Sequence, residues 1–172
     1  MTRKNNYKEL CAAYDIGVEA CDNYRRQCRE FVQELRASII ESLGCLETKI
    51  FMFQASKGFV FRSHVIQGDA FDTEFGDGGT AIIGFSINVN HDLQDKFFTF
   101  MVIFKQIDGK FHFHIIDDEA EFINTADSFA DFGEHLFGIA YHNLAERLQN
   151  FLESPDEVSA PIGFRVQHEI DK

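Results

Sequence analysis

Residues 97–116 read FFTFMVIFKQIDGKFHFHII, and they constrain the fold more than any other stretch of the chain. Asp108-Gly109 separates two strongly β-prone runs, and this dipeptide is typical of a two-residue hairpin turn because both turn positions need positive φ. Such a turn sets the register, so Phe104 should lie opposite Phe113. The first strand is apolar on both sides, and we therefore expect both faces of the sheet to be covered there.

The hairpin register also sorts the side chains into two faces, because successive residues of a strand point to opposite sides. One face is uniformly apolar and consists of Phe98, Phe100, Val102, Phe104, Phe111, Phe113 and Ile115. The other face is mixed and consists of Thr99, Met101, Ile103, Lys105, His112, His114 and Ile116. The first face is the predicted core.

The first 43 residues predict one long amphipathic helix. Apolar side chains recur along one line of it, namely Tyr7, Leu10, Tyr14, Val18, Cys21, Cys28, Val32, Leu35, Ile39 and Leu43. Gly17 is a place for a bend or break, and Gly44 is a natural stop. The helix would be about 55 Å long, whereas a compact domain of this length is about 40 Å across. We therefore expect the helix to break or to project, and a projecting apolar stripe needs a partner.

The remaining elements follow from the same kind of pattern. Three further strands, joined by loops that suit antiparallel pairing, are expected at 50–54, 59–65 and 81–89. A second long helix follows the sheet, with a Ser or Thr near 125–128 as its cap. Its expected apolar face is Phe129, Leu136, Phe137, Ala140, Leu144, Leu148 and Phe151.

We predict one α+β domain over residues 1–172, since a chain that is 45% hydrophobic with two prolines has enough core for a single domain. A long N-terminal helix covers 1–44, and a five- or six-stranded, mainly antiparallel sheet covers 46–116. A long C-terminal helix over 125–154 packs on the sheet. The tail, 155–172, alternates in hydrophobicity and is a possible extra strand.

The formal charge of −12 argues against nucleic acid as a partner, because binding nucleic acid requires a basic surface. Acidic residues concentrate in 117–157, where Arg147 is the one Lys or Arg, and this suggests a basic protein partner. No run approaches the roughly 20 apolar residues of a membrane span, and the N-terminus lacks the apolar core of a signal peptide. Four cysteines without a paired spacing indicate reduced, mostly buried thiols and a cytoplasmic location.

Familiar catalytic motifs are missing from the sequence: it has no hydrolase elbow, no phosphate loop and no H-E-x-x-H. His112 and His114 point the same way from one strand and lie about 6–7 Å apart, so both imidazoles could reach one divalent metal such as zinc. His64, Asp117 or Asp118 could supply a third ligand. The alternative is that both histidines are ordinary surface or packing residues.

Our first functional hypothesis is a non-enzymatic, acidic protein-interaction module that acts as a homodimer. It would bind a basic or partly unfolded protein, as small acidic secretion chaperones, adaptors and immunity proteins do, although no motif identifies a family. The first helix would supply much of the dimer interface, through Tyr14, Cys21, Cys28, Val32, Leu35 and Ile39.

The second hypothesis is a small-molecule-binding or sensory domain in which a curved sheet surrounds a Phe-lined cavity. Its ligand-binding residues would be His112, His114, His64, Met101 and Phe85. The segment 66–80 would serve as a lid. A third hypothesis is a metal-assisted enzyme that uses His112 and His114.

Overall fold

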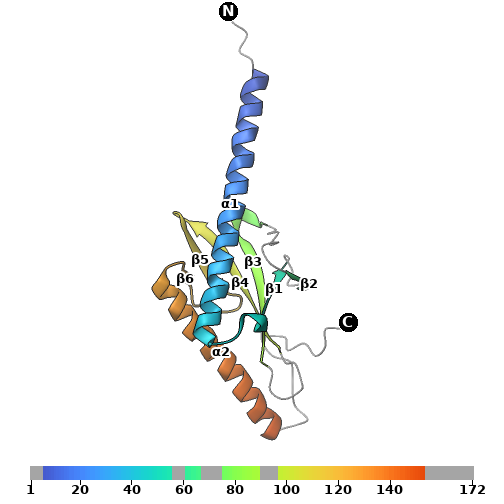
Figure 1. Ribbon diagram of the computed structural model, residues 1–172, viewed down its shortest axis with the longest axis vertical. Helices are drawn as coiled ribbons and strands as arrows, with labels where there is room; N and C mark the ends of the chain where they lie inside the picture. Colours follow the sequence, from blue (N-terminus) through green and yellow to red (C-terminus); the bar gives the residue numbers. More distant parts are fainter. Residues whose placement is uncertain (1–5, 56–60, 67–74, 90–96, 154–172) are drawn as a thin grey trace, which may run out of the picture.

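The computed structural model describes residues 6–55, 61–66, 75–89 and 97–153 (Figure 1). Its elements, in chain order, are α1 (Asn6–Leu43), a 3-10 turn (Glu47–Lys49), β1 (Ile50–Ala55), β2 (Phe61–Ile66), a second 3-10 turn (Asp77–Gly79), β3 (Ala81–Asn88), β4 (Phe97–Ile107), β5 (Lys110–Ile115), β6 (Phe122–Ile123) and α2 (Ala126–Glu153). The α+β prediction is confirmed. The expected strand in 155–172 and most of the suggested lid lie outside the described residues.

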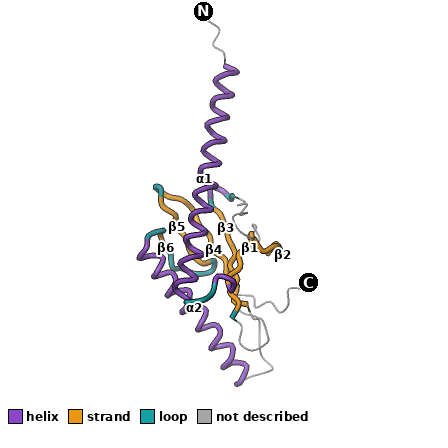
Figure 2. The backbone as a smooth tube through the Cα atoms, viewed as in Figure 1, coloured by secondary structure: helices purple, strands orange, loops and turns teal. Residues whose placement is uncertain are grey.

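The strands form one antiparallel sheet in the order β2-β1-β3-β4-β5-β6 (Figure 2). Five of these strands are the expected ones, with ends shifted by one or two residues. The sixth, β6, is a two-residue strand at 122–123 that pairs with β5. It is too short to show any periodicity in the sequence.

The β4–β5 hairpin has the predicted turn and register. Asp108 and Gly109 have φ of 50° and 79°, the positive values that a type I′ turn requires. Phe104 pairs with Phe113, and every second residue of β4 from Phe98 to Phe104 is buried. This alternation places the uniformly apolar face of the hairpin in the core.

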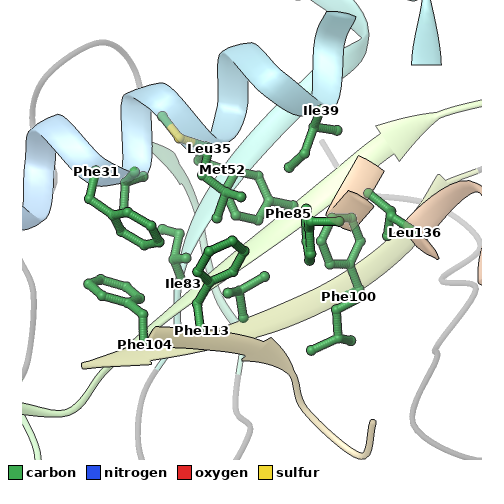
Figure 3. Close-up of a cluster of buried hydrophobic side chains, with 14 of the residues drawn as sticks. Phe31, Leu35, Ile39, Met52, Ile83, Phe85, Phe100, Phe104, Phe113 and Leu136 are labelled. Carbon is green, nitrogen blue, oxygen red and sulfur yellow. The ribbon is translucent and has the colours of Figure 1, made fainter. Parts of the chain in front are cut away.

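Both helices lie on that apolar face, so the described residues form one helical layer and one sheet layer (Figure 1). Phe31 of α1 is central to the contact, with its ring centroid 5.0 Å from that of Phe104 and 5.3 Å from that of Phe113. Phe132 of α2 meets the same Phe113 at 5.2 Å. Figure 3 shows Leu35 and Ile39 of α1 pointing into the same layer of rings and aliphatic side chains.

α1 is continuous through Gly17 and ends where the sequence predicts. Gly44 has φ of +60°, and its N–H and that of Cys45 bond to the carbonyl oxygens of Glu41 and Ile40. This is the hydrogen-bond pattern of a Schellman C-cap, which needs a residue that tolerates positive φ. The helix therefore does not break: it projects well beyond the sheet (Figure 1).

α2 begins as expected, because the Thr125 hydroxyl accepts a hydrogen bond from the N–H of Ser128. Its expected apolar face was partly wrong. Leu136 is buried as expected and Phe132 is buried too, whereas Phe137 and Leu144 are exposed. The side chains of Leu148 and Phe151 lie outside the described part of the structure. The buried line of α2 is thus rotated away from Phe137 toward Phe132, because the helix meets the sheet and α1 on two different sides.

Candidate interaction surface

The first half of α1 is the least covered part of the described structure. Every residue of 6–23, a segment that we call the arm, is exposed, and it projects from one end of the sheet (Figure 1). Tyr7, Leu10, Tyr14 and Val18 lie along one line of the arm at helical spacing, and all four are exposed. With Cys21 they form what we call the arm stripe. Contiguous exposed apolar surface of this kind marks interaction sites in soluble proteins.

Tyr24 marks the point where α1 meets the rest of the domain. Its hydroxyl donates a 2.6 Å hydrogen bond to the carbonyl oxygen of Gly79, and its ring centroid lies 5.2 Å from that of Phe75. Burial raises the pKa of Tyr24 to about 12 and that of the neighbouring Cys28 thiol to about 11. Both groups are therefore neutral at ordinary pH, as suits the edge of an apolar core.

The residues that the sequence suggested for a dimer interface fall into two groups. Tyr14 and Cys21 are exposed on the arm. The others are buried in the core of the same chain, between α1 and its own sheet, and are Cys28, Val32, Leu35 and Ile39. A second copy cannot reach this second group without opening the core, so among the suggested interface residues only Tyr14 and Cys21, on the arm, are accessible to it.

α2 carries a second line of exposed apolar side chains. Phe129 and Gly133 meet α1, where the Ser38 hydroxyl donates to the Phe129 carbonyl oxygen at 3.1 Å and Gly133 lies against Ser42. The same face continues with Phe137 and Tyr141, which are 56% and 66% exposed and whose rings stack at 5.9 Å. Together with Ala140 and Leu144 they form what we call the α2 stripe.

The proposed ligand-binding residues do not converge on one cavity. Phe85 pairs with Phe100 and is fully buried on the helix-covered face, since directly paired residues point to the same side. Met101, His112 and His114 are on the opposite face of the sheet and are partly exposed. The side chain of His64, in β2, lies outside the described part of the structure.

The two histidines of β5 are placed as the strand period predicts, with His114 opposite Ile103 and His112 opposite Lys105. Nδ1 of His112 lies 3.2 Å from the Glu121 carboxylate. Among the described residues, no group of three or more His, Cys, Asp or Glu side chains is arranged to hold a metal ion. The metal-site hypothesis thus gains no third ligand from this part of the chain.

Asp118 has a different partner from the one suggested by the sequence. Its carboxylate lies 2.6 Å from Nε2 of His135 in α2, and it also accepts a hydrogen bond from the N–H of Ala120. Partial burial acts to raise the pKa of Asp118, but these two neighbours outweigh it and hold the pKa below its usual value. The pair fastens the turn after β5 to α2. The contact joins residues from separate elements, so no local pattern pointed to it.

Acidic side chains gather on the surface around β6 and the start of α2. Those that are exposed include Asp117, Glu119, Glu121, Asp127, Asp131 and Glu134. Within 117–146 the sequence has no Lys or Arg, so no basic residue of this segment balances the negative charge. Such a surface attracts a basic partner and steers its approach.

All four cysteines are free, as expected, but the expectation that most are buried was wrong. Cys11 and Cys21 are exposed on the arm, whereas Cys28 is buried and Cys45 is partly covered. The reason is the projection of α1, which carries half of the cysteines away from the core. The two exposed thiols give the arm natural positions for chemical labelling.

Comparison with protein-family models, with curated proteins and with solved structures finds no match for this chain. Among the described residues, neither helix has an apolar stretch long enough to cross a membrane. The arm and the α2 stripe are therefore interpreted from their own geometry and chemistry.

Proposed function

We propose that this chain is a non-enzymatic protein-interaction module that works as a homodimer and contacts its second copy through the arm. The observation that carries the proposal is the exposed arm stripe. A helical segment of roughly 18 residues outside a folded body is only marginally stable in water unless one of its faces is packed. The apolar residues of the arm stripe, at helical spacing on one line, provide the face that a partner would cover.

The second part of the proposal is that the dimer binds a basic or partly unfolded protein. The support is the formal charge of −12 together with the exposed acidic side chains between Asp117 and Glu134. Two copies would present two such surfaces to one partner, which increases the strength of an electrostatic contact. Binding of this kind should weaken as salt is added, because exposed charges are screened.

Sedimentation velocity of the full chain at micromolar concentration tests the dimer. We expect twice the chain mass for the wild-type protein. Tyr14→Glu should give a monomer, because it places a charge in the apolar contact. Tyr14 is 72% exposed in the single chain, so this substitution leaves the core intact.

Ile16→Glu is the matched control. Ile16 is 68% exposed and sits on the same arm, but it points away from the arm stripe at 100° per residue. This variant should remain a dimer. A wild-type monomer, or the loss of the dimer in both variants alike, would contradict the proposal.

A further inference from the structure

We infer that the α2 stripe of one copy receives the arm of the other, so that two copies exchange arms around a two-fold axis. This inference rests on the proposed homodimer and names the surface to which the arm binds. The occupant to which we commit is a second copy of this chain. The inference rests on how α1 and α2 already pack within one subunit.

The α2 stripe continues an existing helix contact. Ser38 and Ser42 of α1 meet Phe129 and Gly133 of α2, so both helices advance by four residues from one contact to the next. The following position on that row of α2 is Phe137. α1 has ended by then, at Leu43, and the row is left exposed. A helix that covers the α2 stripe would therefore extend a surface on which a helix is already packed.

The two exposed stripes lie at opposite ends of the molecule. The arm projects past one end of the sheet, and the later part of α2 projects past the other (Figure 1). Both helices run in the same general direction in that view. A two-fold axis across them places the arm of each copy beside α2 of the other, with the two helices antiparallel. Two equivalent contacts then cover both α2 stripes and part of both arm stripes, in a closed dimer.

The area that each subunit contributes favours the exchange over a simple pairing of arms. The arm is about 27 Å long and about 10 Å wide, so that one of its faces offers roughly 270 Å². A stable interface takes about 800 Å² from each partner. Paired arms use one such face per subunit, whereas exchanged arms use the arm stripe and, in addition, the α2 stripe, which is about 10 Å long over 137–144. The area that each subunit contributes is therefore larger in the exchanged dimer, and closer to that of a stable interface.

Charge and shape point in the same direction. The arm carries Lys8 and the acidic Glu9, Asp15, Glu19 and Asp22. Two arms packed stripe to stripe would bring Asp15 and Asp22, which flank the arm stripe at 100° per residue, close to those of the other copy, whereas Glu146 is the only acidic residue of 137–146. Gly17, beside the arm stripe, has no side chain, and an added Cβ atom would meet nothing within 4 Å, so the arm is narrow there. The large rings of Phe137 and Tyr141 are suited to pack against such a position.

Cross-linking between two differently tagged chains tests the exchange. The first chain keeps Cys21 and carries Cys11→Ser. The second carries Cys11→Ser, Cys21→Ser and either Tyr141→Cys or Leu144→Cys. After mixing and treatment with a short bismaleimide, we expect a covalent pair of unlike chains. The matched control is His142→Cys in the second chain, because His142 is exposed on the side of α2 away from the α2 stripe. We expect severalfold less product from this control.

Each other result overturns the exchange. A product formed by two copies of the first chain means that the arms pair with each other, so the dimer stands but the inference fails. Equal yields from positions 141 and 142, or no product in a sample that sediments as a dimer, also reject it. A sample that sediments as a monomer rejects both the exchange and the proposed function. Circular dichroism of each variant identifies any chain that has failed to fold, and Leu144→Cys then replaces Tyr141→Cys.

Discussion

The carboxylate of Asp118 lies 2.6 Å from Nε2 of His135 and joins the turn after β5 to α2. The Asp118 side chain is mostly covered, and its second bond, from the N–H of Ala120, fixes the turn itself. The pair is thus a polar link between the sheet layer and the helical layer, at the edge of an otherwise apolar core.

We expect Asp118→Asn to lower the free energy of unfolding by about 1 kcal/mol at pH 7, since it weakens a charge-assisted contact. The pKa of Asp118 is lowered in the folded protein, so its stabilising effect is fully present above the unfolded pKa of about 4. It is lost as the pH falls through the lowered folded value. The difference between the wild-type protein and the variant, measured by urea unfolding, should therefore shrink below about pH 4.

The control for this measurement is Glu146→Gln, which alters the exposed 3.0 Å contact between Nε2 of His142 and the Glu146 carboxylate. An exposed pair of this kind contributes about 0.5 kcal/mol or less. If Asp118→Asn and Glu146→Gln have equal effects, or if the Asp118 effect is the same at pH 3 as at pH 7, the link is not electrostatic.

Phe113 and Phe104 are direct neighbours across β4 and β5, and both are almost completely buried. Phe113→Ala should lower the free energy of unfolding by about 3–5 kcal/mol, because the cavity would open between the two helices and the sheet. Ile107→Ala, next to the exposed turn of the same hairpin, should change it by about 0.5 kcal/mol. Urea unfolding would measure both. A loss below about 1 kcal/mol for Phe113→Ala would show that the core closes around the missing ring.

The hairpin could be predicted from the sequence because its register depends on two adjacent turn residues. A two-residue turn fixes which residues of the two strands pair, and the dipeptide Asp108-Gly109 identifies this turn. The C-terminal end of α1 and the start of α2 could also be predicted, from Gly44 and Thr125 respectively. These are local signals, each contained within a few residues.

The faces of β3 and β4 could not be related to each other in the same way. The segment 90–96 between these strands does not specify a turn type, so it does not determine whether Phe85 shares a face with Phe100 or with Met101. The structure pairs Phe85 with Phe100, and this removes Phe85 from the suggested ligand site. A slip of one residue would have reversed the outcome.

The sequence also does not show where the exposed part of α1 ends and its packed part begins. The apolar line of α1 runs without a change of character from Tyr7 to Ile39, whether it is packed on the sheet or exposed. The packing of the sheet against α1 stops near Tyr24 because the sheet is shorter than the helix. The Asp118–His135 contact could not be predicted either, because it depends on how the chain returns through β6 to α2.

Tyr24 leads to a prediction about high pH. Burial raises its pKa to about 12, so the folded protein keeps this phenol neutral where an unfolded chain would ionise it. Its contribution to stability is present below about pH 10 and is lost as the pH rises through about 12. An absorbance titration should show a phenolate component near pH 12 that is missing in Tyr24→Phe. Tyr141→Phe, which changes an exposed ring, should retain that component.

Tyr24→Phe should also lower the free energy of unfolding at pH 7 by about 1 kcal/mol, because the carbonyl oxygen of Gly79 loses its donor. If the component near pH 12 persists in this variant, then a different tyrosine is the buried one. The placement of the segment around Gly79 against α1 would then be wrong.

The crossing of α1 and α2 depends on a glycine. A Cβ atom added at Gly133 would overlap the side chain of Ser42, whereas one added at Gly138, a turn and a half further along α2, would meet nothing within 4 Å. Gly133→Ala should therefore push the helices apart and lower the free energy of unfolding by about 1–3 kcal/mol. Gly138→Ala should raise it by about 0.5–1 kcal/mol, because alanine is the better helix former.

The double variant Ser42→Gly with Gly133→Ala removes the side chain at position 42 of α1 and adds one at position 133 of α2. It should recover most of the stability lost by Gly133→Ala alone. A coupling of this sign in a double-mutant cycle, measured by urea unfolding, would demonstrate the close approach. Equal effects of alanine at 133 and 138 would mean that the helices do not meet there. In that case the α2 stripe would no longer continue an existing helix contact, and the reason for placing a second arm on it would be removed.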